Sequence, residues 1–303
     1  MGGRHDVREL LELYRQGKNI TEHLRSLEGA AHNSETAILY AYDVQAGSYV
    51  RAMADPVYAP RKRAAAARIA EVLAPLRFDS MLDAGTGEAT TLAELLPLLP
   101  RRPESVLAFD LSLSRLLFAR SHLRERAIAR VELFTAALEN IPLADASVDL
   151  VLTVHVVEPN GGREREVLAE LLRVARRYLV LVEPSFELAS DEARRRMEAH
   201  GYVRALPDHL RALGARIALH EPFGADLNPL NPAAILVVDQ GERAAPPGGP
   251  TLVSPLTGTP LARGDGFLCS RDGFAFPVIA GIACLLPDNA VLATYLPDFT
   301  AGA

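Results

Sequence analysis

The stretch MLDAGTGEAT, residues 81–90, joins a short apolar run to a glycine-rich turn. Glycine has no Cβ atom, so Gly85 and Gly87 allow a tight turn and a close approach of a ligand to the backbone. The segment from Ala89 to about Leu96 has the pattern of a helix. A strand that ends in such a turn and leads into a helix is the usual nucleotide-binding corner of a doubly wound sheet.

Strand and helix patterns alternate on the C-terminal side of this corner, and residues 190–213 predict a helix that is interrupted near Pro207. The expected strands cover residues 81–85, 105–110, 131–136, 148–157, 178–184, 215–222 and 233–240. The last two strands follow each other without a helix, which predicts an antiparallel edge hairpin. We therefore expect an α/β fold with a doubly wound, mostly parallel seven-stranded sheet.

The chain divides into four expected segments: a helical N-terminal lid or extension, the sheet domain, a Pro/Gly linker and a small, separate β-rich module. Their expected bounds are 1–60, 61–240, 241–250 and 251–303. Within the first segment, the pattern predicts one continuous helix over residues 34–53.

The bulk composition limits the function classes. The chain has 303 residues and a formal net charge of −6, which disfavours nonspecific contact with nucleic-acid phosphates. Its two cysteines fit a reducing cytosol. No apolar run is long enough for a membrane span, and the charged N-terminus does not fit a signal peptide. We expect a cytoplasmic protein with a small-molecule substrate and no nucleic-acid or membrane partner; a homodimer is compatible with the composition.

An acidic residue precedes the glycine turn. The dinucleotide fingerprint G-x-G-x-x-G fails, because Thr90 stands where the third glycine would be. Asp83 would repel a pyrophosphate, whereas it suits a ligand that carries an ammonium and a sulfonium group. The alternative is that Gly85 and Gly87 form a plain turn and Asp83 caps a helix.

In these residues the chain resembles class I S-adenosylmethionine-dependent methyltransferases, over about residues 80–240. LDAGTGEAT is similar to their first motif, and Asp110 matches the acid that binds the ribose hydroxyls of the cofactor. Residues 137–153 are similar to the stretch that passes the adenine. The resemblance implies S-adenosylmethionine as the cofactor. The cofactor-binding residues that it implies are Asp83, Ala84, Gly85, Thr86, Gly87, Asp110, Leu111, Ala137, Leu138 and His155.

Two positions depart from that family pattern. Ala89 stands where the third glycine of the methyltransferase turn is found. The acid that often follows the third strand is missing, and the stretch there reads Thr135-Ala136-Ala137-Leu138. Backbone groups and apolar walls would then have to hold the adenine.

Two polar residues follow the fourth expected strand, where such folds bring substrate and cofactor together. His155 is a candidate general base, since the ordinary pKa of histidine is about 6.5; the alternative is a structural histidine. Glu158 is the second candidate catalytic residue, which would orient a substrate amine or hydroxyl. The Asn-Pro-Pro-aromatic motif of methyltransferases that act on nucleic-acid amino groups is absent here.

Three residues share one face of the helix expected over residues 34–53, namely Tyr42, Gln45 and Tyr49. A glutamine is an unusual choice for a core, because its buried amide needs hydrogen-bond partners. We expect this face to contact substrate or to cover the cofactor as a lid. The alternative is an ordinary packed face.

The stretch from Leu252 to Ala290 resembles the small zinc-ribbon-like partner subunit that activates several translation-factor and tRNA methyltransferases. The FPVIAGI segment, residues 276–282, is retained. The two cysteine knuckles are reduced to Ser254-Pro255-Leu256-Thr257 and Cys269-Ser270-Arg271-Asp272. Structural zinc needs about four nitrogen or sulfur ligands. We therefore expect a metal-free module that docks on the catalytic domain or on a partner.

The leading hypothesis is methyl transfer from S-adenosylmethionine to a nitrogen or oxygen of a small molecule. The stretches YDVQAGSY, HVVEPNGG and LNPLNP are similar to bacterial methyltransferases of sugar or surface-polysaccharide pathways, which favours a sugar or another biosynthetic intermediate as the acceptor. One alternative is an RNA or protein methyltransferase that carries its activator in the same chain. Another is a non-catalytic scaffold that keeps the cofactor pocket.

Overall fold

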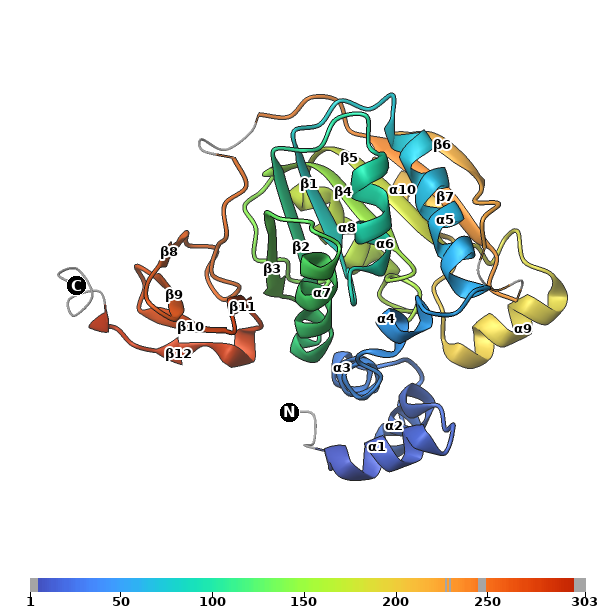
Figure 1. The fold of residues 1–303 in the computed structure, drawn as a ribbon, viewed down its shortest axis with the longest axis horizontal. Helices are drawn as coiled ribbons and strands as arrows, with labels where there is room; N and C mark the ends of the chain where they lie inside the picture. The colour runs from blue at the N-terminus through green and yellow to red at the C-terminus, as the bar shows by residue number, and fades with distance from the viewer. Residues whose placement is uncertain (1–4, 227, 229, 245–248, 297–303) are drawn as a thin grey trace.

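The computed structural model describes residues 5–226, 228, 230–244 and 249–296. Parts of the expected linker, of the LNPLNP stretch and of the C-terminal segment lie outside these ranges. A twisted central sheet carries helices on both faces, the N-terminal helices lie beyond one end of it, and the C-terminal strands extend one of its edges (Figure 1).

Seven strands form the central part of the sheet and confirm the expected fold class. They are β1 (Ser80–Ala84), β2 (Ser105–Asp110), β3 (Val131–Thr135), β4 (Val148–Val154), β5 (Ala175–Pro184), β6 (Ile217–Pro222) and β7 (Ala233–Asp239). Their order is β6-β7-β5-β4-β1-β2-β3. Strands β1 to β5 pair in parallel, whereas β7 is antiparallel to both β5 and β6. The strand order switches beside β1, so the carboxyl ends of β1 and β4 form a crevice for a ligand.

In the chain, α5 (Tyr58–Leu73) precedes β1, and the other helices of the sheet domain connect successive strands. These helices are α6 (Thr90–Leu95) with the 3₁₀ turn η1 (Leu96–Leu98), α7 (Leu113–Glu125), α8 (Glu164–Val174), α9 (Asp191–His200) and α10 (Leu206–Ala212). The interruption expected near Pro207 is present, since α9 ends at His200 and α10 begins at Leu206. Gly201 ends α9 in a left-handed conformation, and Pro207 lies in the first turn of α10, where its missing N–H costs no hydrogen bond.

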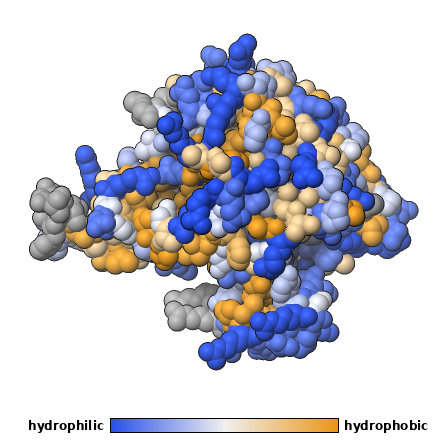
Figure 2. Space-filling view, in the orientation of Figure 1, coloured by the Kyte–Doolittle hydropathy of each residue, from blue (hydrophilic) through white to orange (hydrophobic). Residues whose placement is uncertain are grey.

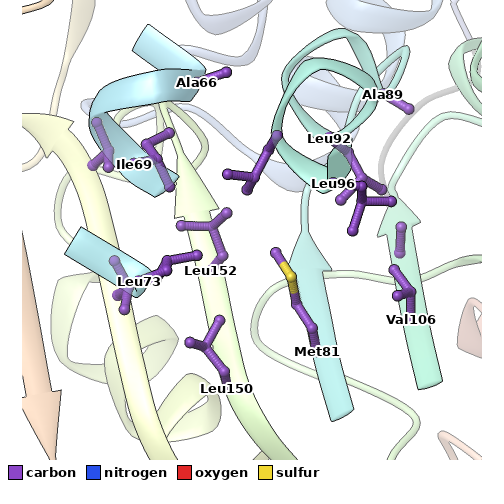
Figure 3. Packing of buried hydrophobic residues seen from close by; sticks show 14 of the residues in the cluster. Ala66, Ile69, Leu73, Met81, Ala89, Leu92, Leu96, Val106, Leu150 and Leu152 are labelled. Carbon is purple, nitrogen blue, oxygen red and sulfur yellow. The ribbon is translucent and has the colours of Figure 1, made fainter. Parts of the chain in front are cut away.

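Two apolar clusters form the core, one on each face of the sheet. On one face, Ile69 and Leu73 of α5 pack near Leu152 of β4, and Leu92 of α6 lies beside Met81 of β1 (Figure 3). Each of these side chains is at most 1% exposed, and full burial of such a side chain contributes about 1.5–3 kcal/mol. This packing holds β1 and β4 rigidly, and with them the turns at their carboxyl ends.

The N-terminal segment contains α1 (Val7–Arg15), α2 (Ile20–Glu28), α3 (Glu35–Val44) and α4 (Ser48–Ala52). The prediction of one continuous helix over residues 34–53 was wrong, because the chain turns at Gly47 with a φ of +86°. The buried carboxylate of Glu88 accepts hydrogen bonds from the backbone N–H groups of Gly47 and Val50, at 2.9 and 2.6 Å. Glu88 belongs to the glycine turn, so a residue of this turn stabilises the break between α3 and α4.

The C-terminal strands are β8 (Leu261–Arg263), β9 (Phe267–Ser270), β10 (Phe274–Ile279), β11 (Ile282–Cys284) and β12 (Val291–Leu292), with the 3₁₀ turn η2 (Pro287–Asn289) before β12. Docking on the catalytic domain was one of the two expectations for this module, and the structure shows it. Strand β11 pairs in parallel with β3, where Ala283 is aligned with Phe134. The backbone N–H of Leu285 also donates to the Thr135 hydroxyl at 2.9 Å. The module therefore docks on the sheet domain and covers its β3 edge.

The surface of the C-terminal module carries exposed apolar side chains. Ile279, Val291, Leu292 and Tyr295 are 47 to 72% exposed, and Figure 2 shows apolar surface over this part of the molecule. Among the described residues, no three His, Cys, Asp or Glu side chains gather in a way that could hold a metal ion. None of the helices in the described part of the chain has the length and apolar composition needed to cross a membrane.

Candidate active site

A cavity of about 440 Å³ lies at the carboxyl ends of the central strands, within the range of roughly 300–1,000 Å³ that is usual for small-molecule sites. The glycine turn, the ends of β2 and β4 and the segment after β3 form its floor. Side chains from α3, α4 and α5 cover it. Of the residues expected at the site, it brings together Tyr42, Tyr49, Gly85, Thr86, Gly87, Asp110, Leu111, Ala137, Leu138, His155 and Glu158.

The glycine turn has a backbone that only glycine adopts easily. Gly85 and Gly87 have φ values of +69° and +59°, in the left-handed region that disfavours any residue with a Cβ atom. A Cβ atom on Gly85 would lie 2.4 Å from both Cγ atoms of Val156. Ala89 also has a left-handed conformation, with a φ of +55°. Its methyl group therefore carries a backbone strain that the family's glycine avoids.

Asp110 ends β2 beside this turn and is 7% exposed. Its Oδ2 accepts the backbone N–H of Gly87 at 3.0 Å, and its Oδ1 accepts that of Ser112 at 2.9 Å. Each carboxylate oxygen keeps a second lone pair, so the group can still accept hydrogen bonds from a ligand. The Asp110 carboxylate thus links the glycine turn after β1 to the segment after β2.

Asp83, Ala84 and Gln45 do not line the cavity. Asp83 is 4% exposed beneath the turn, and burial raises its pKa to about 6, although the nearby Lys62 cation opposes that rise. Gln45 is the C-terminal capping residue of α3, at the break before α4. The expected lid face is therefore divided between two helices, and its two tyrosines are the members that reach the cavity.

His155 and Glu158 form a hydrogen-bonded pair after β4. The Nδ1 atom of His155 lies 3.0 Å from Oε2 of Glu158. His155 has a left-handed backbone with a φ of +54°, which ends β4 earlier than expected and is costly for a non-glycine residue. Because an ionised carboxylate only accepts hydrogen bonds, Nδ1 carries the proton and Nε2 is the basic nitrogen of the neutral ring.

The surroundings set the basicity of this histidine. Burial lowers the pKa of His155 and the Lys62 cation lowers it further. The hydrogen bond and charge of Glu158, together with the charge of Glu183, outweigh both effects and raise the pKa above its ordinary value of 6.5. The pair is therefore arranged as a base with its orienting carboxylate.

Glu183 ends β5 and was not expected at the site. It is 0% exposed, and burial raises its pKa to about 7. Its carboxylate accepts the backbone N–H groups of Val156, Val157 and Glu158 at 3.1 to 3.2 Å. Glu183 thereby fixes the loop that carries His155 and Glu158, although it does not line the cavity.

The far end of the cavity lies after β3. Ala136, Ala137 and Leu138 provide the apolar wall that the sequence predicted there. Glu35 and Glu139 also line this end. Burial and the adjacent Glu139 carboxylate raise the pKa of Glu35 to about 7. Carboxyl groups are thus available at the end where the sequence lacks the usual acid.

Comparison with known proteins adds the family. Residues 81–178 match the family model described as a methyltransferase domain. The chain carries a methyltransferase domain. S-adenosylmethionine is the methyl donor of this enzyme class, which confirms the expected activity and cofactor. No curated protein sequence matches the chain.

Three solved structures illustrate what the chain is similar to, and the first of them supports the fold of the sheet domain. Magnesium protoporphyrin IX methyltransferase from Synechocystis PCC 6803, solved with bound S-adenosylhomocysteine, is 15% identical with a TM-score of 0.53, over 69% of this chain and 100% of that one. A methyltransferase from Aquifex aeolicus is 20% identical with a TM-score of 0.43, over 63% and 96%. A complex of the Haloferax volcanii Trm112 activator with a methyltransferase gives 14% identity and a TM-score of 0.49, over 66% and 96%.

The cavity fits the cofactor of the methyltransferase domain. Gly85 and Gly87 leave the floor free of Cβ atoms, Asp110 offers acceptors for hydroxyl groups, and the apolar wall after β3 can hold a flat ring. Lys62 lines the same cavity, and burial lowers its pKa to about 8. A carboxylate would restore a partner to this buried ammonium group.

Among the polar residues in and beside the cavity that sequence reasoning missed are Lys62, Arg115, Glu183 and Asn231. Lys62 lies in an alanine-rich helix that looks solvated, and Arg115 follows Asp110 by five residues after a stretch of alternating leucines and serines. Glu183 could have been found, since it ends the fifth strand next to the switch in strand order. Asn231 reaches the cavity from the β6–β7 connection, and no local pattern places that connection there.

Proposed function

We propose that this protein methylates a nitrogen or oxygen of a small molecule, with His155 as the general base and Glu158 as its orienting carboxylate. The observation that carries the proposal is the His155–Glu158 hydrogen bond inside the cavity of the glycine turn and Asp110. When bound, S-adenosylmethionine supplies a methyl group on a positively charged sulfur. The residues of this chain would bind and align the cofactor and the acceptor, and would remove a proton from the acceptor.

The cofactor would be held by the residues that the resemblance implied. Asp110 would accept hydrogen bonds from the ribose hydroxyls, each such charge-assisted bond contributing on the order of 1.5–3 kcal/mol. Gly85 and Gly87 would let the cofactor approach the backbone, and Leu111, Ala137 and Leu138 would enclose the adenine. Lys62 would pair with the cofactor's carboxylate, while Asp83 would act from beneath the turn through Lys62.

The acceptor would lose its proton to Nε2 of His155 as its nitrogen or oxygen attacks the methyl carbon. The bound cofactor would supply the methyl group and keep the electron pair of its carbon–sulfur bond. Glu158 stabilises the imidazolium that forms, because its carboxylate already accepts the Nδ1 proton. Tyr42 and Tyr49 would shield this end of the cavity from water. The cavity volume of about 440 Å³ favours a small acceptor such as a sugar or another biosynthetic intermediate.

We propose that the C-terminal module takes part in forming the site, like a zinc-ribbon-like activator fused to its enzyme but without metal. It pairs with β3 directly before the apolar wall. The side-chain amide of Asn140 donates to the backbone oxygen of Pro255 at 3.0 Å, and the N–H of Val253 donates to the oxygen of Pro142 at 3.0 Å. These contacts hold the segment that follows Leu138 in place.

The pH dependence of turnover tests the role of His155. Turnover of an acceptor found among small amines and alcohols should rise with pH through an inflection above 6.5, because neutral imidazole is the base and the pKa of His155 is raised. In Glu158→Gln, the inflection should move to lower pH, since the largest upward cause is removed. Formation of S-adenosylhomocysteine is measured across the pH range. An inflection that is the same in both proteins would show that His155 is not the base.

A further inference from the structure

Arg115 is a buried cation without a hydrogen-bonding partner. It lies in the first turn of α7, is 9% exposed and lines the cavity. The guanidinium lies over the rings of Tyr42 and Tyr49, 5.1 and 4.9 Å from their centroids. Among the described residues, its Nε has no hydrogen-bond partner and the guanidinium forms no ion pair. Such a group is unusual, because buried guanidinium groups normally use their N–H donors.

The carboxylates near Arg115 balance its charge but do not take its hydrogen bonds. The negative charges of Asp110 and Glu88 favour the protonated guanidinium. Neither carboxylate is hydrogen-bonded to the guanidinium; their oxygens accept the backbone N–H groups of Gly87 and Ser112 (Asp110) and of Gly47 and Val50 (Glu88). The two tyrosine rings hold the planar group in place. This arrangement leaves a fixed set of donors that matches the two oxygens of a carboxylate or phosphate.

Asn231 is a second buried group with a free hydrogen-bonding atom. It is 8% exposed and lines the same cavity. Its Nδ2 donates to Oε2 of Glu158 at 3.2 Å. This assignment of the amide is required chemically, because the carboxylate can only accept. Among the described residues, no donor then reaches the buried Oδ1 atom. This atom lies next to the His155–Glu158 pair and needs an N–H or O–H donor.

We propose that Arg115 and Asn231 select the methyl acceptor. An oxyanion of the acceptor, a carboxylate or phosphate, pairs with Arg115, and an N–H or O–H of the acceptor other than the one that His155 deprotonates donates to Oδ1 of Asn231. The substrate class is therefore a small acid that also carries a hydroxyl or amino group. This inference rests on the proposed function and narrows it.

Two observations connect the ends of this acceptor site. Tyr42 and Tyr49 contact Arg115 and also feel the charge of Glu158, which contributes to the raised pKa of each tyrosine after the main effect of burial. Both rings thus lie within electrostatic reach of the cation and of the carboxylate that orients the base. The cofactor's own carboxylate would have a second cation in Lys62, whose pKa is affected by the charges of Asp83 and Arg115.

The first experiment uses inorganic phosphate as the probe on the full chain saturated with S-adenosylhomocysteine. The ¹⁵Nε–¹Hε signal of Arg115, assigned by its loss in Arg115→Gln, should shift saturably on titration. Phosphate should bind at least about fivefold more weakly to Arg115→Gln, because the charge-assisted bonds are lost. The matched control is Arg124→Gln, an exposed arginine of the same helix, which should bind phosphate like the unmutated protein. Absence of a saturable shift would overturn the proposal.

The second experiment separates the acceptor from the cofactor. Calorimetry compares S-adenosylhomocysteine with 5′-methylthioadenosine, which lacks the amino-acid carboxylate. In Arg115→Gln, the ratio of the S-adenosylhomocysteine affinity to the 5′-methylthioadenosine affinity should stay within about twofold of its value in the unmutated protein. In Lys62→Met, this ratio should fall about tenfold. If Arg115→Gln instead weakens only S-adenosylhomocysteine, Arg115 binds the cofactor and the acceptor assignment is wrong. Failure of the unmutated protein to bind S-adenosylhomocysteine would contradict the proposed function itself.

The third experiment tests the acceptor class directly. A panel of small hydroxy and amino acids is compared with the corresponding methyl esters for acceptor-dependent formation of S-adenosylhomocysteine. The acids should be preferred, and Asn231→Leu should raise the KM of the best acceptor about tenfold without changing S-adenosylhomocysteine affinity. Equal use of acids and esters would exclude the role of Arg115, and an unchanged KM would exclude that of Asn231. Retained cofactor binding and an unchanged unfolding temperature show that each variant is folded.

Discussion

Replacing Gly85 with valine is expected to abolish detectable binding of S-adenosylhomocysteine. The residue has a φ of +69°, and a Cβ atom there would lie 2.4 Å from Val156. Left-handed backbone costs an ordinary residue about 1–2 kcal/mol, and a β-branched residue tolerates it worst. Relief of the clash would push the glycine turn into the space that the cofactor needs. Isothermal calorimetry measures the result.

The matched control is Gly214→Val. Gly214 has a φ of +78°, no atoms lie within 4 Å of its Cβ position, and it does not line the cavity. This variant carries the same kind of backbone strain without the clash, so it should still bind S-adenosylhomocysteine. Binding by Gly85→Val as tight as that of the unmutated protein would mean that the cofactor does not approach this turn.

His155→Ala should lower turnover by about a hundredfold or more, because removal of a positioned general base typically costs this much. The affinity for S-adenosylhomocysteine should change by no more than about twofold, since the proposed role is in proton transfer. Acceptor-dependent formation of S-adenosylhomocysteine gives the first quantity and calorimetry the second.

His155→Asn is the matched variant for this prediction. Asparagine adopts the left-handed conformation of residue 155 with little strain and can still donate a hydrogen bond to Glu158, but it is no base. The two variants should therefore lose turnover to a similar extent. If His155→Asn keeps full turnover, the histidine is structural and alignment alone carries the reaction.

The regular parts of the fold could be predicted because each element carries a local pattern. The apolar runs that became β1 to β5 and the glycine turn are recognisable without tertiary information. The errors arose where contacts between distant residues decide the backbone. The helix expected over residues 34–53 breaks because Glu88 accepts the N–H groups of Gly47 and Val50. The C-terminal module joins the sheet through a pairing of β11 with β3 that no local pattern encodes.

The same distinction between local sequence patterns and contacts of distant residues applies to the residues of the site. Gly85, Gly87, Asp110 and His155 follow strands, and the carboxyl ends of parallel strands form the floor of the cavity. Sequence reasoning therefore found them. Asn231 reaches the site from the β6–β7 connection, and its role depends on meeting Glu158 across the cavity.

Arg115 shows why residue type alone can mispredict which side chains are buried. On a helix, an arginine is usually a solvated surface residue. Here the tyrosines of α3 and α4 cover it, because those helices are tied to the glycine turn by Glu88 and to the start of α7 by the Asp43–Ser112 hydrogen bond of 2.6 Å. Its burial follows from the docking of the N-terminal segment.

The central claim is that the acid–glycine turn and Asp110 bind the methyl donor. Its most direct test is calorimetric titration of the unmutated chain and of Asp110→Ala with S-adenosylhomocysteine. The account predicts one bound ligand per unmutated chain and an affinity at least about tenfold weaker in Asp110→Ala, because charge-assisted bonds to the ribose are lost. Equal affinity of the two proteins, or no binding to the unmutated chain, would contradict it.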